Sequence, residues 1–528
     1  MPARKFKVLV AEELNPEGLR GLTRAARVEV KTGLSEADLL KAVADCDALI
    51  VRSATQVTRR VLEAGKRLKV VGRAGVGVDN IDVEAATERG VAVVNAPEES
   101  TAAAAEHTVA MMLALARRIP QADASMRKGK WERSRFVGVQ VVGKTLGVIG
   151  LGRVGSDVAR KARGLGMRVV GTDPFLSPGR AREMGIEFLP MEKVLAQADF
   201  LTLHVPLTSE TRHLLGKKEL SSVKPGVRVV NASRGGVIDE AALVEALKSG
   251  RVAGAALDVF AEEPPKGSPL LSMEQVVLTP HLGASTVEAQ SRVAQTIADQ
   301  VLAALEGRPV RNAINIVTLR PEHAEALGPY LPLAEKVGSL ASQLLGAPPR
   351  QVEVALHGAE VEAEAQVLSN AALRGALEPW EPGVNLVNAS RVAKRKGVQT
   401  SAFATEAIEG LAGLVAVKVA AGKAKKEVAG TVFGRDDPRI VKIDGYRVNA
   451  VPEGYMIVGP HIDKPRIIGP VGMVMGDARI NIAAMQVGRI RQGEEAIMVL
   501  NVDAPVTPEI LARLRKIDGI LDVKLVKL

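Results

Sequence analysis

The chain has almost no cysteine and few aromatic residues. Cys46 is its one cysteine in 528 residues, which excludes an intramolecular disulfide framework and fits a reducing compartment. Aromatic residues make up 2% of the chain, so cores built from its 47% hydrophobic residues are expected to be aliphatic. Few rings are available to stack on nucleic-acid bases, and the lysines and arginines are dispersed among acids. We therefore interpret the net charge of +10 as a solvated basic surface that steers an anionic substrate.

The sequence also lacks an apolar segment long enough to cross a bilayer. The most hydrophobic stretch, residues 102–116, contains Glu106 and His107 and is too short to span one. The first segment, KFKVLVAEEL, predicts a short strand and has no long apolar core of the kind found in signal peptides. We therefore expect a soluble, cytoplasmic protein with no membrane partner, and its length predicts about three or four domains.

Short apolar strands alternate with helical segments through two parts of the chain, residues 5–95 and 145–280. These strands are apolar on both faces and are separated by helices, which predicts buried parallel sheets. An alanine-rich helix is expected over 100–118, and another over about 286–305.

The pattern changes at Pro321. Residues 321–450 contain predicted helices and β-like runs but no catalytic constellation, and we interpret their basic cluster at 394–396 as an exposed face. The last segment, 455–528, has the order β-α-β-β-α-β, which predicts a ferredoxin-like unit.

The most informative motif is the glycine turn in TLGVIGLGRVGSDVARK, residues 145–161. Gly150 permits a tight turn, Gly152 lets a pyrophosphate approach the backbone, and Gly155 lets the following helix pack close to the strand. Asp173 ends the next apolar run, where an acid would hold the ribose hydroxyls of NAD and repel the extra phosphate of NADP. The strand, the helix and the acid together predict dinucleotide binding.

Three further residues lie at the ends of later predicted strands, where open α/β sheets bind ligands. Arg234 offers a bidentate fork for a substrate carboxylate. His281 can exchange a proton with a ketone or alcohol oxygen, and Glu263 would pair with it. Each residue alone is more typical of a structural or surface position. Their combination with the nucleotide site predicts hydride transfer between NAD and a 2-hydroxy acid.

The sequence resembles the D-2-hydroxyacid dehydrogenase family, and within it the long form of the D-3-phosphoglycerate dehydrogenases. The similarity covers nearly all of residues 1–310. Its motifs are RSAT (52–55), VVGRAGVGVDNID (70–82), NAPEESTAAAAEHTVAMMLALAR (95–117), GKWERSRFVG (129–138), KTLGVIGLGRVG (144–155), NASRGGVIDE (231–240), ALDVFAEEPP (256–265) and TPHLGAST (279–286).

The resemblance implies an α/β architecture of four units. A Rossmann-like NAD-binding domain, 98–290, is expected to be inserted in a flavodoxin-like substrate-binding domain formed by 1–97 and 291–320. An α+β intervening domain, 321–450, and a ferredoxin-like ACT regulatory domain, 455–528, are expected to follow. Closure of the cleft between the first two domains would exclude water.

The resemblance also assigns site residues, position by position. It implies Arg234, Glu263 and His281 as the catalytic residues, with no metal site. Besides the glycine turn and Asp173, NAD is expected to contact Val76, Arg153, Val154, Val205, Ala232, Asp258, Gly283 and Ala284. Substrate is expected at Arg52, Ser53, Arg73 and Gly75, where the arginines could neutralise a phosphate. The loop 129–138 reaches the partner subunit in the family, so a homodimer or homotetramer is expected.

The implied reaction is NAD-dependent oxidation of 3-phospho-D-glycerate to 3-phosphooxypyruvate, the first step of serine synthesis. Interconversion of 2-oxoglutarate and 2-hydroxyglutarate by the same site is a further expectation. Glyoxylate reductases and formate dehydrogenases share the nucleotide motifs but are less expected to carry an ACT-like tail. Some relatives of the fold are NAD-sensing corepressors that act by binding protein, and the ACT-like terminus favours metabolic control instead.

ACT domains of this family bind serine where two such domains pair. His461, Asp463 and Asn481 occupy the positions expected for the effector. The usual D-x-P-G turn is here Asp463-Lys464-Pro465-Arg466, and an arginine side chain would restrict the approach of an amino acid to the backbone. We therefore predict weak or absent inhibition by serine. The alternative is an ACT domain that only dimerises.

Overall fold

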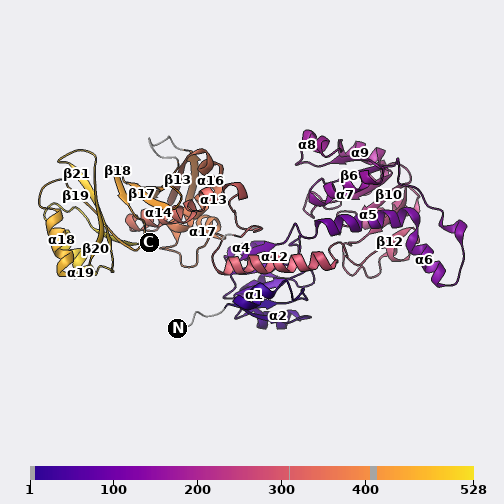
Figure 1. Cartoon of the computed structure of the whole chain (residues 1–528), viewed down its shortest axis with the longest axis horizontal. Helices are drawn as coiled ribbons and strands as arrows, with labels where there is room; N and C mark the ends of the chain where they lie inside the picture. Colours follow the sequence, from indigo (N-terminus) through magenta and orange to yellow (C-terminus); the bar gives the residue numbers. More distant parts are fainter. Residues whose placement is uncertain (1–5, 309, 405–412) are drawn as a thin grey trace.

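The computed structural model describes residues 6–308, 310–404 and 413–528, and it contains four sheets that follow one another along the chain (Figure 1). The expected α/β fold class is confirmed. Within the described part of the chain, no helix is both long and apolar enough to cross a membrane.

The first sheet is parallel and has the order β2-β1-β3-β4-β5, which is the flavodoxin-like order. Its strands are β1 (Lys7–Val10), β2 (Arg27–Val30), β3 (Ala48–Val51), β4 (Val70–Arg73) and β5 (Ala92–Asn95). The helices that connect them are α1 (Arg20–Ala25), α2 (Glu36–Val43), α3 (Arg59–Ala64) and α4 (Val83–Glu88).

A late helix, α12 (Val287–Leu305), completes this first layer. Its buried residues Ile297 and Val301 pack so closely on β4 that a Cβ at Gly72 would collide with Val301. The chain therefore returns to the first sheet after the second sheet is finished. Because α12 begins at Val287, its first turn precedes the predicted domain boundary at 291.

The second sheet is also parallel, with the order β12-β11-β10-β9-β6-β7-β8. This order places β6 and β9 side by side at the point where the strand sequence reverses, as in Rossmann folds. Its strands are β6 (Thr145–Ile149), β7 (Arg168–Thr172), β8 (Glu187–Phe188), β9 (Phe200–Leu203), β10 (Val227–Asn231), β11 (Val252–Leu257) and β12 (Val276–Leu278).

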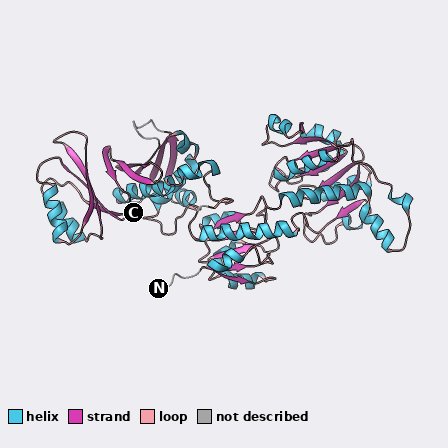
Figure 2. Cartoon of the chain, viewed as in Figure 1, coloured by secondary structure: helices cyan, strands magenta, loops and turns pink. Residues whose placement is uncertain are grey.

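Helices cover both faces of the second sheet (Figure 2). They are α5 (Thr101–Arg117), α7 (Arg153–Gly164), α8 (Pro178–Glu183), α9 (Met191–Gln197), α10 (Lys217–Ser222) and α11 (Glu240–Lys248), whereas α6 (Ile119–Arg127) follows α5 and lies outside these layers (Figure 1). Two aliphatic clusters, one on each side of the strands, form its core, with Phe200 as their largest fully buried side chain. Both faces are thus apolar, as the continuous hydrophobic strands predicted.

The third sheet has the order β14-β13-β15-β16-β17-β18 and is antiparallel except for the β13–β14 pair. Its strands are β13 (Gln351–His357), β14 (Gln399–Ala404), β15 (Leu414–Ala421), β16 (Ala424–Phe433), β17 (Asp437–Ile443) and β18 (Tyr446–Ala450). Its helices are α13 (Ala324–Leu327), α14 (Tyr330–Leu345), α15 (Ala359–Ala363), α16 (Ala365–Leu377) and α17 (Ala389–Arg395). The basic cluster 394–396 is exposed, as expected.

The fourth sheet has the order β20-β21-β19-β22, the arrangement of a ferredoxin-like unit. Its elements are β19 (Tyr455–Ile462), α18 (Ile468–Asp477), β20 (Ile482–Arg489), β21 (Glu495–Val502), α19 (Pro508–Arg515) and β22 (Lys524–Lys527). The predicted β-α-β-β-α-β order of this segment is confirmed.

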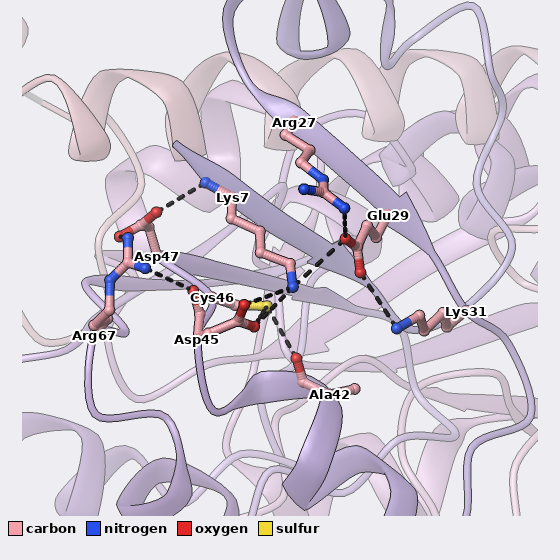
Figure 3. Close-up of polar contacts among 9 residues, drawn as sticks. All are labelled: Lys7, Arg27, Glu29, Lys31, Ala42, Asp45, Cys46, Asp47 and Arg67. Carbon is pink, nitrogen blue, oxygen red and sulfur yellow. Dashed lines mark hydrogen bonds and ion pairs between the residues drawn. The ribbon is translucent and has the colours of Figure 1, made fainter. Parts of the chain in front are cut away.

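The single cysteine is buried just before β3, beside charged residues at the amino-terminal end of the first sheet (Figure 3). Lys7 Nζ contacts Asp45 at 2.7 Å and Glu29 at 3.5 Å, and the thiol itself donates to the Ala42 carbonyl at 3.1 Å. Burial raises the pKa of the Cys46 thiol to about 11, which leaves little reactive thiolate at neutral pH.

Candidate active site

The carboxyl ends of the two parallel sheets enclose a cavity of about 730 Å³. Loops that follow β1, β3, β4, β6, β9, β10, β11 and β12 contribute to its wall. Fifteen of the predicted site residues line it: Arg52, Ser53, Arg73, Gly75, Val76, Gly152, Arg153, Val154, Val205, Ala232, Arg234, Asp258, His281, Gly283 and Ala284. The other predicted residues of these two domains, Gly150, Gly155, Asp173 and Glu263, are not among its lining residues.

The three glycines after β6 have different surroundings. Gly150 has φ of 90°, and a Cβ there would collide with the His204 carbonyl. A Cβ at Gly155 would collide with the Gly150 carbonyl, because α7 begins directly against the turn. Gly152 faces the cavity, with nothing within 4 Å of the position of a Cβ. This open cradle at the start of α7 fits a pyrophosphate, which the first N–H groups of a helix favour.

Asp173 directly follows β7, beside the glycine turn. One carboxylate oxygen accepts the Leu151 N–H at 2.8 Å and the other accepts the Phe175 N–H at 2.8 Å. These bonds fix the carboxylate next to the phosphate cradle, and its remaining lone pairs could accept ribose hydroxyls. The glycine turn and the acid therefore fit an NAD molecule.

His281 and Glu263 form a hydrogen-bonded pair at the cavity wall. Glu263 Oε2 lies 2.8 Å from His281 Nδ1, and Oε1 accepts the Phe260 N–H at 3.1 Å. Burial raises the pKa of Glu263, but the hydrogen bond and charge of His281 outweigh burial and lower it. The carboxylate therefore stays ionised and occupies Nδ1, which leaves Nε2 as the nitrogen available for chemistry.

Asp258 fixes the turn that carries His281. Its buried carboxylate accepts N–H bonds from Leu282 at 2.7 Å and Gly283 at 2.9 Å, and its carbonyl accepts the His281 N–H at 2.9 Å. His107, which the sequence reasoning did not select, lies 3.2 Å from the same carboxylate. His281 has φ of 56°, a left-handed conformation that these bonds maintain.

Three arginines, Arg52, Arg73 and Arg234, also line the cavity. Arg234 Nε donates to Asp79 Oδ2 at 3.0 Å, across the space between the two parallel sheets. Arg73 folds over Gly75, where a Cβ would collide with its guanidinium, and its buried Nε has no hydrogen-bond partner among the described residues. Burial, followed by the charge of Arg234, lowers the pKa of Arg73 to about 10. With Arg52, this cluster is suited to an anion of more than one negative charge.

Two residues that the sequence reasoning missed hold the loop of Arg52. Glu12 accepts the N–H groups of Arg52 at 2.8 Å and Thr55 at 2.9 Å. Asn80 donates to the Arg52 carbonyl at 2.8 Å. Glu12 lies just beyond the carboxyl end of the first strand, so the rule that selected Arg234 and His281 could have selected it too.

The predicted effector residues do not meet within one chain. His461 and Asp463 lie at the end of β21 that begins with Glu495, whereas Asn481 lies beside the opposite end, at Asp503. His461 is 2% exposed, and its Nε2 has no hydrogen-bond partner among the described residues. A ligand that touched all three positions would require a second copy of this domain.

The turn after β19 keeps a glycine-like backbone without a glycine. Arg466 has φ of 67°, a left-handed conformation that L side chains adopt at a cost. Arg466 in place of the usual glycine of the D-x-P-G turn therefore adds a side chain but keeps the left-handed backbone conformation.

Three family models match the chain. They are the NAD binding domain of the D-isomer specific 2-hydroxyacid dehydrogenases over residues 109–283, the D-3-phosphoglycerate dehydrogenase intervening domain over 326–444, and the ACT domain over 461–519.

Relatives extend the similarity to nearly the full length. The D-3-phosphoglycerate dehydrogenase of Archaeoglobus fulgidus is 47% identical, with 99% of this chain and 100% of the relative covered. That of Bacillus subtilis is 43% identical with the same coverage. Among solved structures, the apo D-lactate dehydrogenase of Escherichia coli matches with a TM-score of 0.53 and 31% identity, covering 58% of this chain and 100% of that one.

Proposed function

Because this chain belongs to the D-3-phosphoglycerate dehydrogenase family, we propose that Arg234, His281 and Glu263 are the residues that carry out its reaction. The chain is an NAD-dependent oxidoreductase of the serine pathway. The proposed reaction is oxidation of 3-phospho-D-glycerate to 3-phosphooxypyruvate. The observation that carries the assignment is the Glu263–His281 pair at 2.8 Å, at the wall of a cavity shared with the Gly152 cradle and three arginines.

The arginines divide the negative charges of the substrate between them. Arg234 holds the carboxylate, because a guanidinium fork matches its two oxygens. Arg52 and Arg73 hold the phosphate, and the unpartnered Nε of Arg73 supports this, since a buried donor is stabilised when it gains an acceptor.

His281 moves the proton. Its Nε2 accepts the hydroxyl proton of the substrate as the carbonyl forms, and Glu263 on Nδ1 stabilises the resulting imidazolium. When bound, NAD supplies the acceptor for the hydride that leaves the carbinol carbon. Gly152 and Asp173 would hold its pyrophosphate and ribose, while Gly150 and Gly155 shape the turn that presents Gly152. Closure of the cleft would exclude water from this step.

The same cluster supports a second substrate. In 2-oxoglutarate, a second carboxylate replaces the phosphate opposite Arg52 and Arg73, while Arg234 keeps the first. We therefore propose slower interconversion of 2-oxoglutarate and 2-hydroxyglutarate, detectable as NADH consumption with 2-oxoglutarate.

The test of the main assignment is NADH formation from 3-phosphoglycerate and NAD at alkaline pH. We expect His281→Asn to lower kcat by about 100- to 10,000-fold. His213→Asn is the matched control, because His213 also has a left-handed φ, of 53°, but does not line the cavity. We expect Arg234→Ala to lower kcat/KM by about 100-fold. Retained turnover in either cavity variant would refute its assigned role.

We further propose that the chain works in the cytoplasm as a homodimer or homotetramer and binds an effector at its ACT domain. The ACT match supports a small-molecule effector. Serine is the effector we propose, with weak or absent inhibition because Arg466 replaces the usual glycine. The buried thiol of Cys46 is compatible with a reducing compartment.

A further inference from the structure

Asp79 is the carboxylate that pairs with Arg234 from a loop of the first sheet. It lies in the loop after β4 of the first sheet, whereas Arg234 lies in the loop after β10 of the second sheet. Asp79 Oδ2 accepts from Arg234 Nε at 3.0 Å, and the guanidinium rests on Gly77, where any Cβ would collide with it. The arginine is therefore held in part by residues of the other sheet.

The contact leaves one edge of the guanidinium available. Nε is occupied by Asp79, and Nη1 donates backward to the Ser233 carbonyl at 2.7 Å. In the described part of the chain, Asp79 is the one carboxylate in ion-pair contact with Arg234. A substrate carboxylate could then bind end-on to Nη1 and Nη2 without displacing Asp79.

Asp79 also offsets the repulsion among the positively charged arginines around it. Arg52, Arg73 and Arg234 repel one another, and the charges of Arg234 and Arg52 both lower the pKa of Arg73. Asp79 and Glu12 oppose that effect. Asp79 thus offsets part of the positive charge in the enzyme before an anionic substrate arrives.

We infer that Asp79 is a positioning residue that orients the cavity-lining guanidinium of Arg234 for the substrate carboxylate. The inference rests on the proposed role of Arg234. The alternative is that Asp79 competes with the substrate for the arginine, and the two possibilities predict opposite changes in KM.

The test compares Asp79→Ala, Asp79→Asn and Asp79→Glu in the full-length enzyme. For a positioning residue, we expect Asp79→Ala to raise KM for 3-phosphoglycerate about 5- to 20-fold. The range is lower than for a buried ion pair, because the Asp79 side chain is 54% exposed and solvent weakens its attraction to Arg234. KM for NAD stays within about twofold. Asp79→Asn has a smaller effect, since its amide oxygen can still accept from Nε, and Asp79→Glu restores part of the loss.

Asp45→Asn is the matched control, because Asp45 is an exposed carboxylate in the turn before β3 that pairs with Lys7 (Figure 3) and does not line the cavity. A fall in KM for 3-phosphoglycerate in Asp79→Ala would show competition and overturn the inference. An unchanged KM, or an equal rise in KM for NAD, would overturn it as well.

A double-mutant cycle separates this inference from the proposed function. In an Arg234→Lys background the Nε donor is gone, so we expect Asp79→Ala to change KM less than twofold further. A full additive effect there would mean that Asp79 acts independently of Arg234. If Arg234→Ala itself retained activity, the role of Arg234 would fail, whatever the Asp79 variants do.

Discussion

At the scale of the residue, the glycine turn offers a direct comparison of two similar substitutions. We expect Gly152→Val to leave the fold intact, because nothing lies within 4 Å of its Cβ position, and to weaken NAD binding about tenfold or more by filling the phosphate cradle. Gly155→Val is the contrasting variant. Its side chain would collide with the Gly150 carbonyl, so we expect a loss of about 1–3 kcal/mol of stability.

Thermal unfolding and titration with NADH distinguish the two. The interpretation of the turn would be wrong if Gly152→Val unfolded as readily as Gly155→Val, or if it bound NADH as tightly as the parent.

Single residues were predictable where a local motif fixed them. The glycines and Asp173 stand in a strand-turn-helix context, and Arg234 and His281 follow predicted strands, so their grouping at one edge of a sheet could be inferred. Asp79 and Glu12 act through contacts with residues 155 and 40 positions away, respectively, and no spacing in the sequence indicates such pairs. The roles of these residues stay predictions until the variants are measured.

At the scale of the element, one buried carboxylate connects residues 320–323, which follow the first two sheets, to helices of the third sheet. Glu364, between α15 and α16, is 5% exposed and contacts Arg320 at 2.6 Å and His323 at 2.8 Å. Burial raises the pKa of Glu364, but these hydrogen bonds outweigh burial and hold it below its usual 4.5.

The depressed pKa determines the sign of the pH dependence. The ionised carboxylate stabilises the fold at pH above its unfolded value, and this stabilisation is lost as pH falls through the lower folded value. We expect Glu364→Gln to lower the melting temperature by about 2–4 °C at neutral pH, with the difference from the parent shrinking below about pH 4. Glu360→Gln, an exposed neighbour, serves as the control. A difference that grew on acidification would contradict the assignment.

The turn after β19 supplies the second prediction at this scale. In Arg466→Gly, a glycine adopts the φ of 67° without strain. The variant also removes the arginine side chain that restricts the approach of an amino acid to the backbone. We expect the parent to respond weakly or not at all to serine, and Arg466→Gly to be inhibited more strongly. The measurement is a serine titration of NADH formation for both proteins. Inhibition of the parent by micromolar serine would refute the prediction.

Individual helices and strands were easier to predict than the pairing of strands into sheets. The ferredoxin-like order follows from six well-separated apolar runs, and α12 from its helical spacing. The third sheet was only partly foreseen, because β14 has six exposed residues and gives no apolar alternation. Its pairing with β13 is a tertiary effect that joins residues nearly 50 positions apart.

At the scale of the whole molecule, an apolar arm projects from the second sheet. It comprises α6 and the segment to residue 142, at the right edge of Figure 1. Its exposed hydrophobic residues are Ile119, Met126, Trp131, Val137 and Val142, of which Trp131 and Val137 are each 76% exposed. A monomer rarely leaves so many large apolar side chains together in water, so we expect a second copy of the chain to cover them.

We therefore predict that the arm holds the oligomer together. Replacing Trp131 and Val137 by aspartate should remove about 2 kcal/mol or more of association free energy and raise the dissociation constant about 30-fold or more. The catalytic pair and the arginines come from one chain, so the separated variant should keep measurable activity. Phe175→Asp controls for the loss of an exposed ring, because Phe175 is 96% exposed but lies outside the arm. The measurement is the molecular mass by light scattering across a dilution series. A parent that is monomeric at every concentration, or a double variant as tightly associated as the parent, would contradict the assignment of the arm.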